Sequence, residues 1–388
     1  PLELKAFWVS VIVPTKLNDA VPVVSNGYQR DSVASHTQPP RDAALHKECS
    51  AERRGRDQRL NLLKVLGSIA VVVVHTAMQK ASQVDQTEPA WWFANMSDAA
   101  GRCGSAIFVM VGGAVLLARA SEERPVAFVV ERLARLLPAV VFWTVFYFAW
   151  RQWMWGGLTW QSMAKDLVLG SPWYHLWFMF MMLALYIFIP PLRLLVRDAR
   201  YRNVQLYGLA ACAVATCAAA ALQTTGQVMH SSFIGLAPFF IVYFVGGYLF
   251  YCKAPQISAR ALLMGCILCV GAMAVGVALL NPLLGDWSFV LMYSNRGPFA
   301  MGLTFCVFLL GLKLSQQGLS ARVIQPLATV TLGIYAIHPF WIDMLAIIGL
   351  GPERFGNYWI LMSGVVYLLS VCTALLMARL PVLKYVVR

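Results

Sequence analysis

A lysine and a histidine lie eleven residues apart in a long apolar segment, RLNLLKVLGSIAVVVVHTAMQ. If this segment is helical, the spacing of Lys64 and His75 is close to three whole turns, so both side chains project from one face, about 16 Å apart along the axis. A histidine can take up and release a proton near neutral pH. The pair is therefore a candidate catalytic pair. The alternative is a lysine that extends its amino group to a polar surface and a histidine that only bonds a neighbouring helix.

Two arginines form the second candidate group, in the segment ERLARLLP. Arg132 and Arg135 are three residues apart, so a helix would place them on the same face. Two adjacent guanidinium groups can hold a phosphate through paired hydrogen bonds. The alternative is that the two arginines only anchor the end of an apolar segment.

Two further histidines lie in apolar segments. His338 follows Tyr335 by three residues, on the same face of an expected helix. His175 lies between Trp173 and Trp177. A buried histidine either takes part in chemistry or ties helices together, and the sequence leaves both roles open.

The composition defines the elements that must position these side chains. Of the 388 residues, 59% are hydrophobic and 13% are charged, whereas ordinary globular proteins have roughly 45–50% and about 25%. A soluble fold of this size would leave much of that apolar surface exposed to water. The composition therefore predicts an all-α integral membrane protein, and it excludes a disordered or fibrous chain and argues against a cytosolic enzyme.

Long apolar runs alternate with short polar connections from residue 60 onward. A window of about 20 residues matches a bilayer core roughly 30 Å thick, and on that basis we predict a bundle of ten transmembrane helices. They are expected at residues 60–80, 103–118, 136–154, 173–195, 203–222, 235–252, 260–280, 297–313, 326–348 and 357–379.

The basic residues predict the orientation of these spans. With both termini in the cytoplasm, only six of the 31 Lys and Arg residues fall on the outer side: Lys80, Arg102, Arg151, Lys165, Arg296 and Arg354. This is the bias expected when positive charge stays inside. The net charge of +13 is thus mainly a topology signal, and a nucleic-acid partner is not needed to explain it.

The chain divides into three parts by composition. Residues 1–58 are expected to be a polar, basic and flexible tail, residues 59–380 the membrane domain, and residues 381–388 a short cytoplasmic end. Most of the nine cysteines lie inside apolar runs, and no CxxC pair flanks a second one. We therefore expect neither a metal site nor a disulfide framework.

Tryptophan is distributed unevenly between the two predicted membrane faces. Eleven of the thirteen tryptophans fall on or near the outer side, whereas an anchoring belt should mark both interfaces. Indole rings pack well against the apolar faces of sugars while the N–H acts as a donor. As a group these residues favour an outward-facing carbohydrate ligand; an uneven anchoring belt is the alternative.

Four short segments resemble motifs of one family, the bacterial acyltransferase-3 membrane family. Lys64-x10-His75 resembles its Arg/Lys-x10-His signature, and Arg132-x-x-Arg135 followed by Leu-Leu-Pro resembles its Arg-x-x-Arg motif. The segment from Trp173 to Phe178 is similar to its Trp-Tyr-x-Leu-Trp stretch, and the segment from Leu332 to Pro339 to its Gly-Ile-Tyr-x-x-His-Pro stretch. The resemblance covers residues 59–380. One departure is Val111-Gly112-Gly113, where the family often has Ser-Gly.

The resemblance implies an O-acyltransferase of the bacterial inner (plasma) membrane, expected in a stand-alone form without a fused esterase-like domain. Such enzymes commonly transfer acetyl from cytoplasmic acetyl-CoA, a co-substrate rather than a bound cofactor, to a hydroxyl of an exopolysaccharide, a lipopolysaccharide or another envelope glycan or lipid-linked saccharide. His75, with Lys64, would be catalytic, either as a general base or as a carrier of the acetyl group.

The remaining site residues follow from the same resemblance. Arg132 and Arg135 would bind the CoA phosphates, and the acceptor would meet His175, Trp173, Trp177, Tyr335 and His338. The competing hypothesis is a proton-coupled transporter or flippase of a lipid-linked saccharide that uses the intramembrane histidines. The arginine pair aligned with a histidine-bearing face favours the enzyme, because a transporter needs no CoA-phosphate site.

Overall fold

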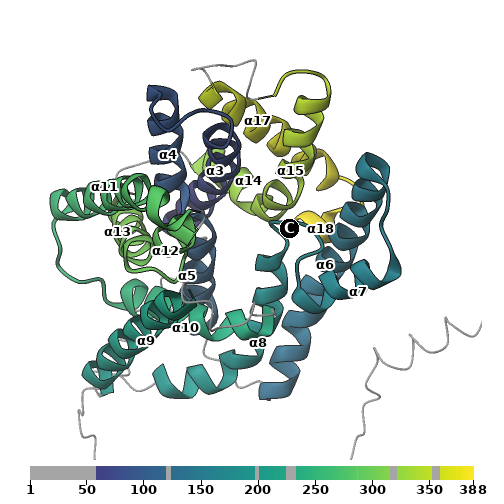
Figure 1. The fold of residues 1–388 in the computed structure, drawn as a ribbon. Coiled ribbons are helices and arrows are strands. Elements are labelled where there is room, and N and C mark those ends of the chain that lie inside the picture. Colours follow the sequence, from purple (N-terminus) through teal and green to yellow (C-terminus); the bar gives the residue numbers. More distant parts are fainter. Residues whose placement is uncertain are drawn as a thin grey trace, which may run out of the picture. The chain divides into compact units, whose positions relative to one another are not determined.

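The computed structural model of the chain describes residues 58–118, 124–196, 201–223, 233–285, 287–314, 321–351 and 359–388. Every regular element in these ranges is a helix (Figure 1), which confirms the all-α prediction. The proposed tail of residues 1–58 lies outside the described residues except for its last residue.

The helices, in chain order, have the following bounds: α3 Gln58–Ala81, α4 Pro89–Gly101, α5 Gly104–Leu116, α6 Pro125–Trp155, α7 Trp160–Leu169, α8 Trp177–Val196, α9 Arg202–Gln223, α10 Phe233–Cys252, α11 Ala259–Leu284, α12 Trp287–Tyr293, α13 Pro298–Leu314, α14 Ala321–Thr329, α15 Thr331–Ile347, α17 Trp359–Met377 and α18 Lys384–Val387.

A helix lies at each of the ten predicted spans, but fewer than ten meet the requirements for crossing a membrane. Within the described part of the chain, seven helical segments are long and apolar enough, and the number rises to eight if α14 and α15, bent by 70° relative to each other, form one broken span. The remaining predicted spans correspond to α6, which carries four charged residues, and α9, which begins with polar ones. The predicted count of ten and the predicted orientation are therefore not confirmed.

The second span begins earlier than predicted. Residues 89–101, expected in an outer loop, form α4, and α4 and α5 together make one candidate span, Pro89–Leu116. The segment begins with a proline, which suits the first turn of a helix, and continues with apolar residues. This places Arg102 at the junction of α4 and α5, inside the span rather than at its outer end.

Helix α3 carries His75 and lies among several other helices. It packs against α4, α5, α13, α14, α15 and α17 (Figure 1). Two hydrogen bonds to α17 fix its rotation: the hydroxyls of Ser68 and Tyr367 are 3.1 Å apart, and those of Thr76 and Ser363 are 2.6 Å apart. Because Thr76 is the neighbour of His75, this contact holds the histidine at a defined angle.

Glycines allow α5 and α10 to cross with their backbones in contact. A Cβ atom on Gly113 would lie 1.8 Å from the carbonyl oxygen of Phe244, and one on Gly247 would lie 2.0 Å from that of Met110. Small residues permit such close approach between membrane helices. Gly113, the second glycine of the Val-Gly-Gly segment, thus has a packing role here.

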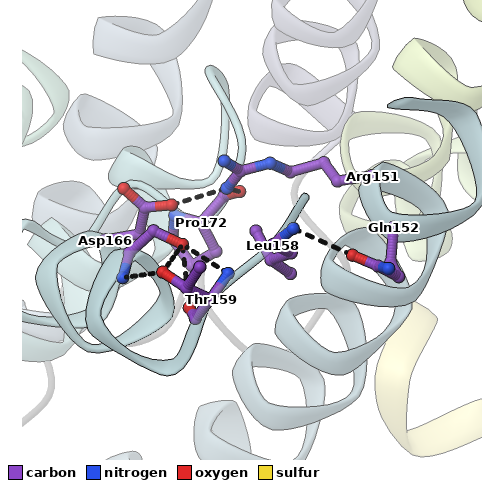
Figure 2. Close-up of polar contacts among 7 residues, drawn as sticks. Arg151, Gln152, Leu158, Thr159, Asp166 and Pro172 are labelled. Carbon is purple, nitrogen blue, oxygen red and sulfur yellow. Dashed lines mark hydrogen bonds and ion pairs between the residues drawn. The ribbon is translucent and has the colours of Figure 1, made fainter. Parts of the chain in front are cut away.

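Polar contacts stabilise the connection from α6 through α7 to α8 (Figure 2). Nη1 of Arg151 donates hydrogen bonds to Oδ2 of Asp166 at 2.5 Å and to the carbonyl oxygen of Pro172 at 3.0 Å. Thr159 caps α7 by accepting from the backbone N–H of Ser162. These bonds hold the segment that leads from Pro172 into His175.

The end of the chain packs into the bundle. Val386 and Val387 are buried, and Nε1 of Trp143 on α6 donates a hydrogen bond to the carbonyl oxygen of Val386 at 2.9 Å. A Cβ atom on Gly333 of α15 would lie 2.7 Å from the side chain of Val387. Helix α18 is therefore clamped between α6 and α15.

Candidate active site

Two cavities meet at one tyrosine. The first, about 100 Å³ in volume, is lined by Val71, Val74, His75, Gly101, Arg102, Ser105, His175, Trp177, Asn295 and Tyr335; we call it the histidine cavity. The second, about 260 Å³, is lined by Phe108, Arg132, Arg135, Leu136, Phe178, Met179, Met182, Tyr186, Thr331, Leu332, Tyr335 and Arg388; we call it the arginine cavity. Tyr335 is the residue common to both.

Three histidines from separate helical regions form one cluster. The ring of His75 on α3 stacks on that of His338 on α15, with centroids 5.2 Å apart. The ring of His175, just before α8, meets His338 edge-on at 5.3 Å. Tyr174 covers His75 from another side, with centroids 4.9 Å apart. The structure thus brings together three residues that are 263 positions apart in the chain from first to last.

Proline 339 determines which nitrogen of His338 carries the hydrogen. A proline has no backbone N–H, so within α15 the carbonyl oxygen of Tyr335, four residues earlier, lacks its usual helical donor. Nδ1 of His338 lies 2.7 Å from that oxygen. Because a carbonyl only accepts hydrogen bonds, Nδ1 must carry the hydrogen. In the neutral ring Nε2 then holds the free lone pair, and it is buried without a partner among the described residues.

His175 is held by the same stretch of α15. Its Nε2 lies 3.1 Å from the carbonyl oxygen of Ala336, which also accepts a hydrogen bond from the hydroxyl of Tyr147 at 2.7 Å. The hydroxyl of Tyr335 in turn donates to the backbone carbonyl of His175. The Nδ1 atoms of His175 and His75 are both buried and have no partner within the described part of the chain. The cluster therefore presents unused lone pairs that a ligand hydroxyl can satisfy.

The two predicted arginines both line the arginine cavity but differ in exposure and in bonding partners. Arg135 is exposed and bonded to Glu131. Arg132 is half-buried, its guanidinium lies 5.2 Å from the ring of Phe128, and its Nε and Nη2 are buried without partners among the described residues. Arg388 adds a third guanidinium that the sequence reasoning did not include. Three arginines around one cavity provide a site for a polyanion.

The other predicted residues divide between the cavity walls and the surrounding packing. Trp177 and Tyr335 line the histidine cavity, whereas His338 lies behind His75 and is not part of the wall. Trp173 stacks on Tyr147 with centroids 5.6 Å apart and lines neither cavity. Lys64 also lines neither cavity, so the structure does not bring it to the histidine cluster.

Sequence reasoning gave too little weight to a group of polar residues that also line the histidine cavity. It contains Arg102, which is paired with the buried Asp98 at 2.6 Å, and Asn295, whose side-chain amide donates to the hydroxyl of Ser105 at 3.0 Å. The available signal was polarity inside apolar segments: Asn95 and Asp98 in α4, and Ser-Asn-Arg between α12 and α13. Within the described ranges, no group of three or more His, Cys, Asp or Glu side chains is arranged to hold a metal ion.

Fold and site together define a multi-pass membrane protein with a buried histidine cluster next to an arginine-lined cavity. The chain belongs to the acyltransferase-3 family, whose model, described as an acyltransferase domain, matches residues 57–379. No curated protein and no solved structure matches the chain. The resemblance expected from the four motifs is confirmed, and the protein is a membrane acyltransferase.

Proposed function

We propose that the protein transfers an acetyl group from acetyl-CoA to a hydroxyl of an exopolysaccharide, a lipopolysaccharide or another cell-envelope glycan, in the bacterial inner membrane. The observation that carries this proposal is the pair of adjoining cavities. One has three arginines suited to a phosphate-rich donor, and the other has histidines suited to deprotonating an alcohol. Because Tyr335 lines both, the acyl group has a short path from donor to acceptor.

The donor binds in the arginine cavity. CoA carries several phosphates, and Arg132 with its two unpartnered nitrogens is the best-prepared group to hold one of them. Arg135 is already bonded to Glu131 and contributes less. The apolar wall formed by Phe108, Phe178 and neighbouring methionines suits the pantetheine arm and its thioester.

His75 acts on the acceptor. Its side chain lines the histidine cavity, so the imidazole can take the proton of an attacking hydroxyl. His338, stacked behind it, supports the ring. His75 is equally placed to carry the acetyl group transiently, and the two routes differ in whether a labelled protein intermediate accumulates.

The acceptor side is formed by Trp177 and His175 at the wall of the histidine cavity. An indole face next to a small polar cavity suits a sugar ring that presents one hydroxyl to the histidines. Lys64 is a basic group on the same helix as His75, lines neither cavity and has no direct part in the proposed transfer. In the proposed domain plan, residues 59–380 form the membrane domain, residues 1–58 precede it, and residues 381–388 follow it and add Arg388 to the arginine cavity.

The test is acetyl transfer by the purified protein in liposomes, with radiolabelled acetyl-CoA and a panel of envelope glycans. We expect label on a glycan, and we expect the His75→Ala variant to lose it while still inserting into membranes, because an apolar residue is well tolerated at that position. Saccharide flux across the liposome membrane without any acetyl transfer would instead support the transporter hypothesis. Normal acetylation by His75→Ala would remove that residue from the reaction.

A further inference from the structure

Arg102 places a permanent charge inside a membrane-spanning segment. It lies between α4 and α5, within the candidate span Pro89–Leu116, and it lines the histidine cavity together with His75. Charged residues inside the membrane are rare and usually have a functional reason. No step of the proposed reaction described so far uses this group.

The guanidinium of Arg102 is held on one edge and on one face. Its Nη2 donates a hydrogen bond to Oδ2 of Asp98 at 2.6 Å, and the Asp98 side chain is 2% exposed. Its central carbon lies 4.6 Å from the centre of the Tyr293 ring. Tyr293 is itself fixed, because its hydroxyl donates to the backbone carbonyl of Asn95 at 2.9 Å. The arginine is therefore kept in one orientation by a carboxylate and a flat aromatic surface.

The buried Nε–H donor of this guanidinium is unused. Nε of Arg102 is buried and has no hydrogen-bond partner among the described residues. Oδ1 of Asp98 likewise has none, so a single hydrogen bond joins the two side chains. Asn295, which lines the same cavity, donates its amide N–H to Ser105, while its Oδ1 is also buried without a partner among the described residues. A buried N–H without an acceptor is unfavourable, and this one belongs to a side chain that lines the histidine cavity.

We propose that the Nε–H of Arg102 stabilises the oxygen anion formed during acyl transfer. This inference rests on the function proposed above. The alcohol oxygen forms a bond to the thioester carbon, the alcohol proton passes to the imidazole, and the carbonyl electron pair moves onto the carbonyl oxygen. The intermediate then collapses, the C–S bond breaks, and the departing CoA sulfur takes the proton back. A donor already in place beside that oxygen favours the intermediate over the neutral thioester.

The Asp98 carboxylate suits this role. It balances the charge of the resting guanidinium, so the pair does not attract a stable anion strongly before reaction. The thioester is neutral, and the negative charge arises only in the intermediate. A fixed N–H next to a compensated charge therefore discriminates between the two states, which is what a transition-state stabiliser requires.

The experiment measures two reactions of the full-length protein in liposomes. The first is CoA release from acetyl-CoA with water as the acceptor, and the second is acetyl transfer to the envelope glycan that takes up label in the panel test. Both pass through the same kind of anion. We expect Arg102→Ala to lower kcat for both by about 10²–10³-fold, as loss of one such donor typically does, with the Kd for acetyl-CoA nearly unchanged. Arg202→Gln is the matched control, since Arg202 bonds backbone carbonyls of α10 and lines neither cavity.

Chemical rescue of the Arg102→Ala protein by added guanidinium separates a part in the reaction from a merely structural role. We expect it to restore part of both reactions without changing the Kd for acetyl-CoA. If Arg102→Ala does not fold, Arg102→Lys, which keeps a cation beside Asp98 but lacks the Nε–H edge, carries the same kinetic test. Its size-exclusion profile in detergent must then match that of the parent protein.

The outcomes separate this inference from the proposed function. A folded variant that loses only glycan transfer, through a higher acceptor KM, while CoA release to water is unchanged would place Arg102 at the acceptor and overturn the inference. So would a variant as active as Arg202→Gln. A parent protein that neither binds nor consumes any acyl-CoA contradicts the proposed function itself, and the inference falls with it.

Discussion

At the scale of single residues, the site depends on which polar atoms already have partners. Arg132 and Arg135 look equivalent in the sequence, yet Arg135 is exposed and bonded to Glu131, whereas two nitrogens of Arg132 are buried without partners among the described residues. The two arginines should therefore differ in how much they contribute to donor binding.

The first prediction is that Arg132→Gln weakens acetyl-CoA binding more than Arg135→Gln does. A lost charge-assisted contact of about 1.5–3 kcal/mol corresponds to at least a tenfold rise in Kd. For Arg135 the loss is smaller because its guanidinium must first leave Glu131. Titration of each purified variant with acetyl-CoA measures both values. Equal effects, or a change in acceptor preference with unaltered Kd, would contradict the assignment.

The second prediction concerns the two tryptophans around His175. Trp177 lines the histidine cavity, whereas Trp173 packs between Tyr147 and Trp155. Trp177→Ala should therefore raise the acceptor KM with the Kd for acetyl-CoA nearly unchanged. A lost stacking contact of about 0.5–1.5 kcal/mol is worth roughly two- to twelvefold in affinity.

Trp173→Ala is the comparison and should act mainly on stability, because its ring fills an aromatic cluster. Steady-state kinetics with varied acceptor, run beside thermal unfolding, separates the two effects. Folded Trp177 variants that lose donor affinity and keep acceptor affinity would show that the cavities have been assigned to the wrong substrates.

At the scale of helices, the bundle contains close helix crossings in which there is no space for an extra atom. Helices α5 and α10 touch at Gly113, where a Cβ atom would lie 1.8 Å from the backbone oxygen of Phe244. At the preceding residue, Gly112, an added Cβ atom would lie 3.4 Å from the Phe244 ring, an ordinary contact. An added Cβ atom therefore has much less space at Gly113 than at Gly112.

The third prediction is that Gly113→Ala destabilises the protein and Gly112→Ala does not. Overpacking of a tight contact costs about 1–3 kcal/mol, and here backbone atoms rather than a flexible side chain must move. Thermal unfolding followed by size exclusion in detergent compares the two variants. The same midpoint for both would mean that α5 and α10 are farther apart in the membrane.

At the scale of the whole molecule, the open question is which membrane face each cavity serves. Arg135 lies in the first half of α6, and Trp160 follows the end of that helix and begins α7. Arg135 and Trp155 are twenty helical steps apart, about 30 Å along the axis, which is one bilayer core. Helix α6 is therefore long enough to place its two ends at opposite surfaces, although its charged and aromatic residues lower its hydropathy.

The fourth prediction is that a cysteine at residue 135 reacts with a membrane-impermeant thiol reagent from the cytoplasmic side, and one at residue 160 from the opposite side. Both side chains are well exposed, at 64% for Arg135 and 82% for Trp160. The parent protein, with its native cysteines, provides the background. Labelling of residue 135 from the outer side would invert the predicted orientation and leave the donor site facing away from cytoplasmic acetyl-CoA.

The sequence alone determined the fold class, the family and most of the residues that could do chemistry. It could do so because long apolar runs define membrane helices, and because an ionisable side chain within such a run stands out, as His75 and His338 do. Arg132 was found by its spacing from Arg135. Motif spacing then identified the family, which the match over residues 57–379 confirms.

Only the tertiary structure decided how those residues are used. Spacing along one helix placed Lys64 with His75, but the contacts that matter to His75 come from other helices, and Lys64 lines neither cavity. Arg102 was expected at an outer surface because α4 was not recognised as a helix that continues the span. The role of Pro339 in orienting His338 depends on a hydrogen bond within a folded α15. The ring contacts of His75 come from distant parts of the chain. The bonds of Arg102 and His338 are local, but they depend on where the helices begin and end in the folded protein, and short sequence patterns do not encode that.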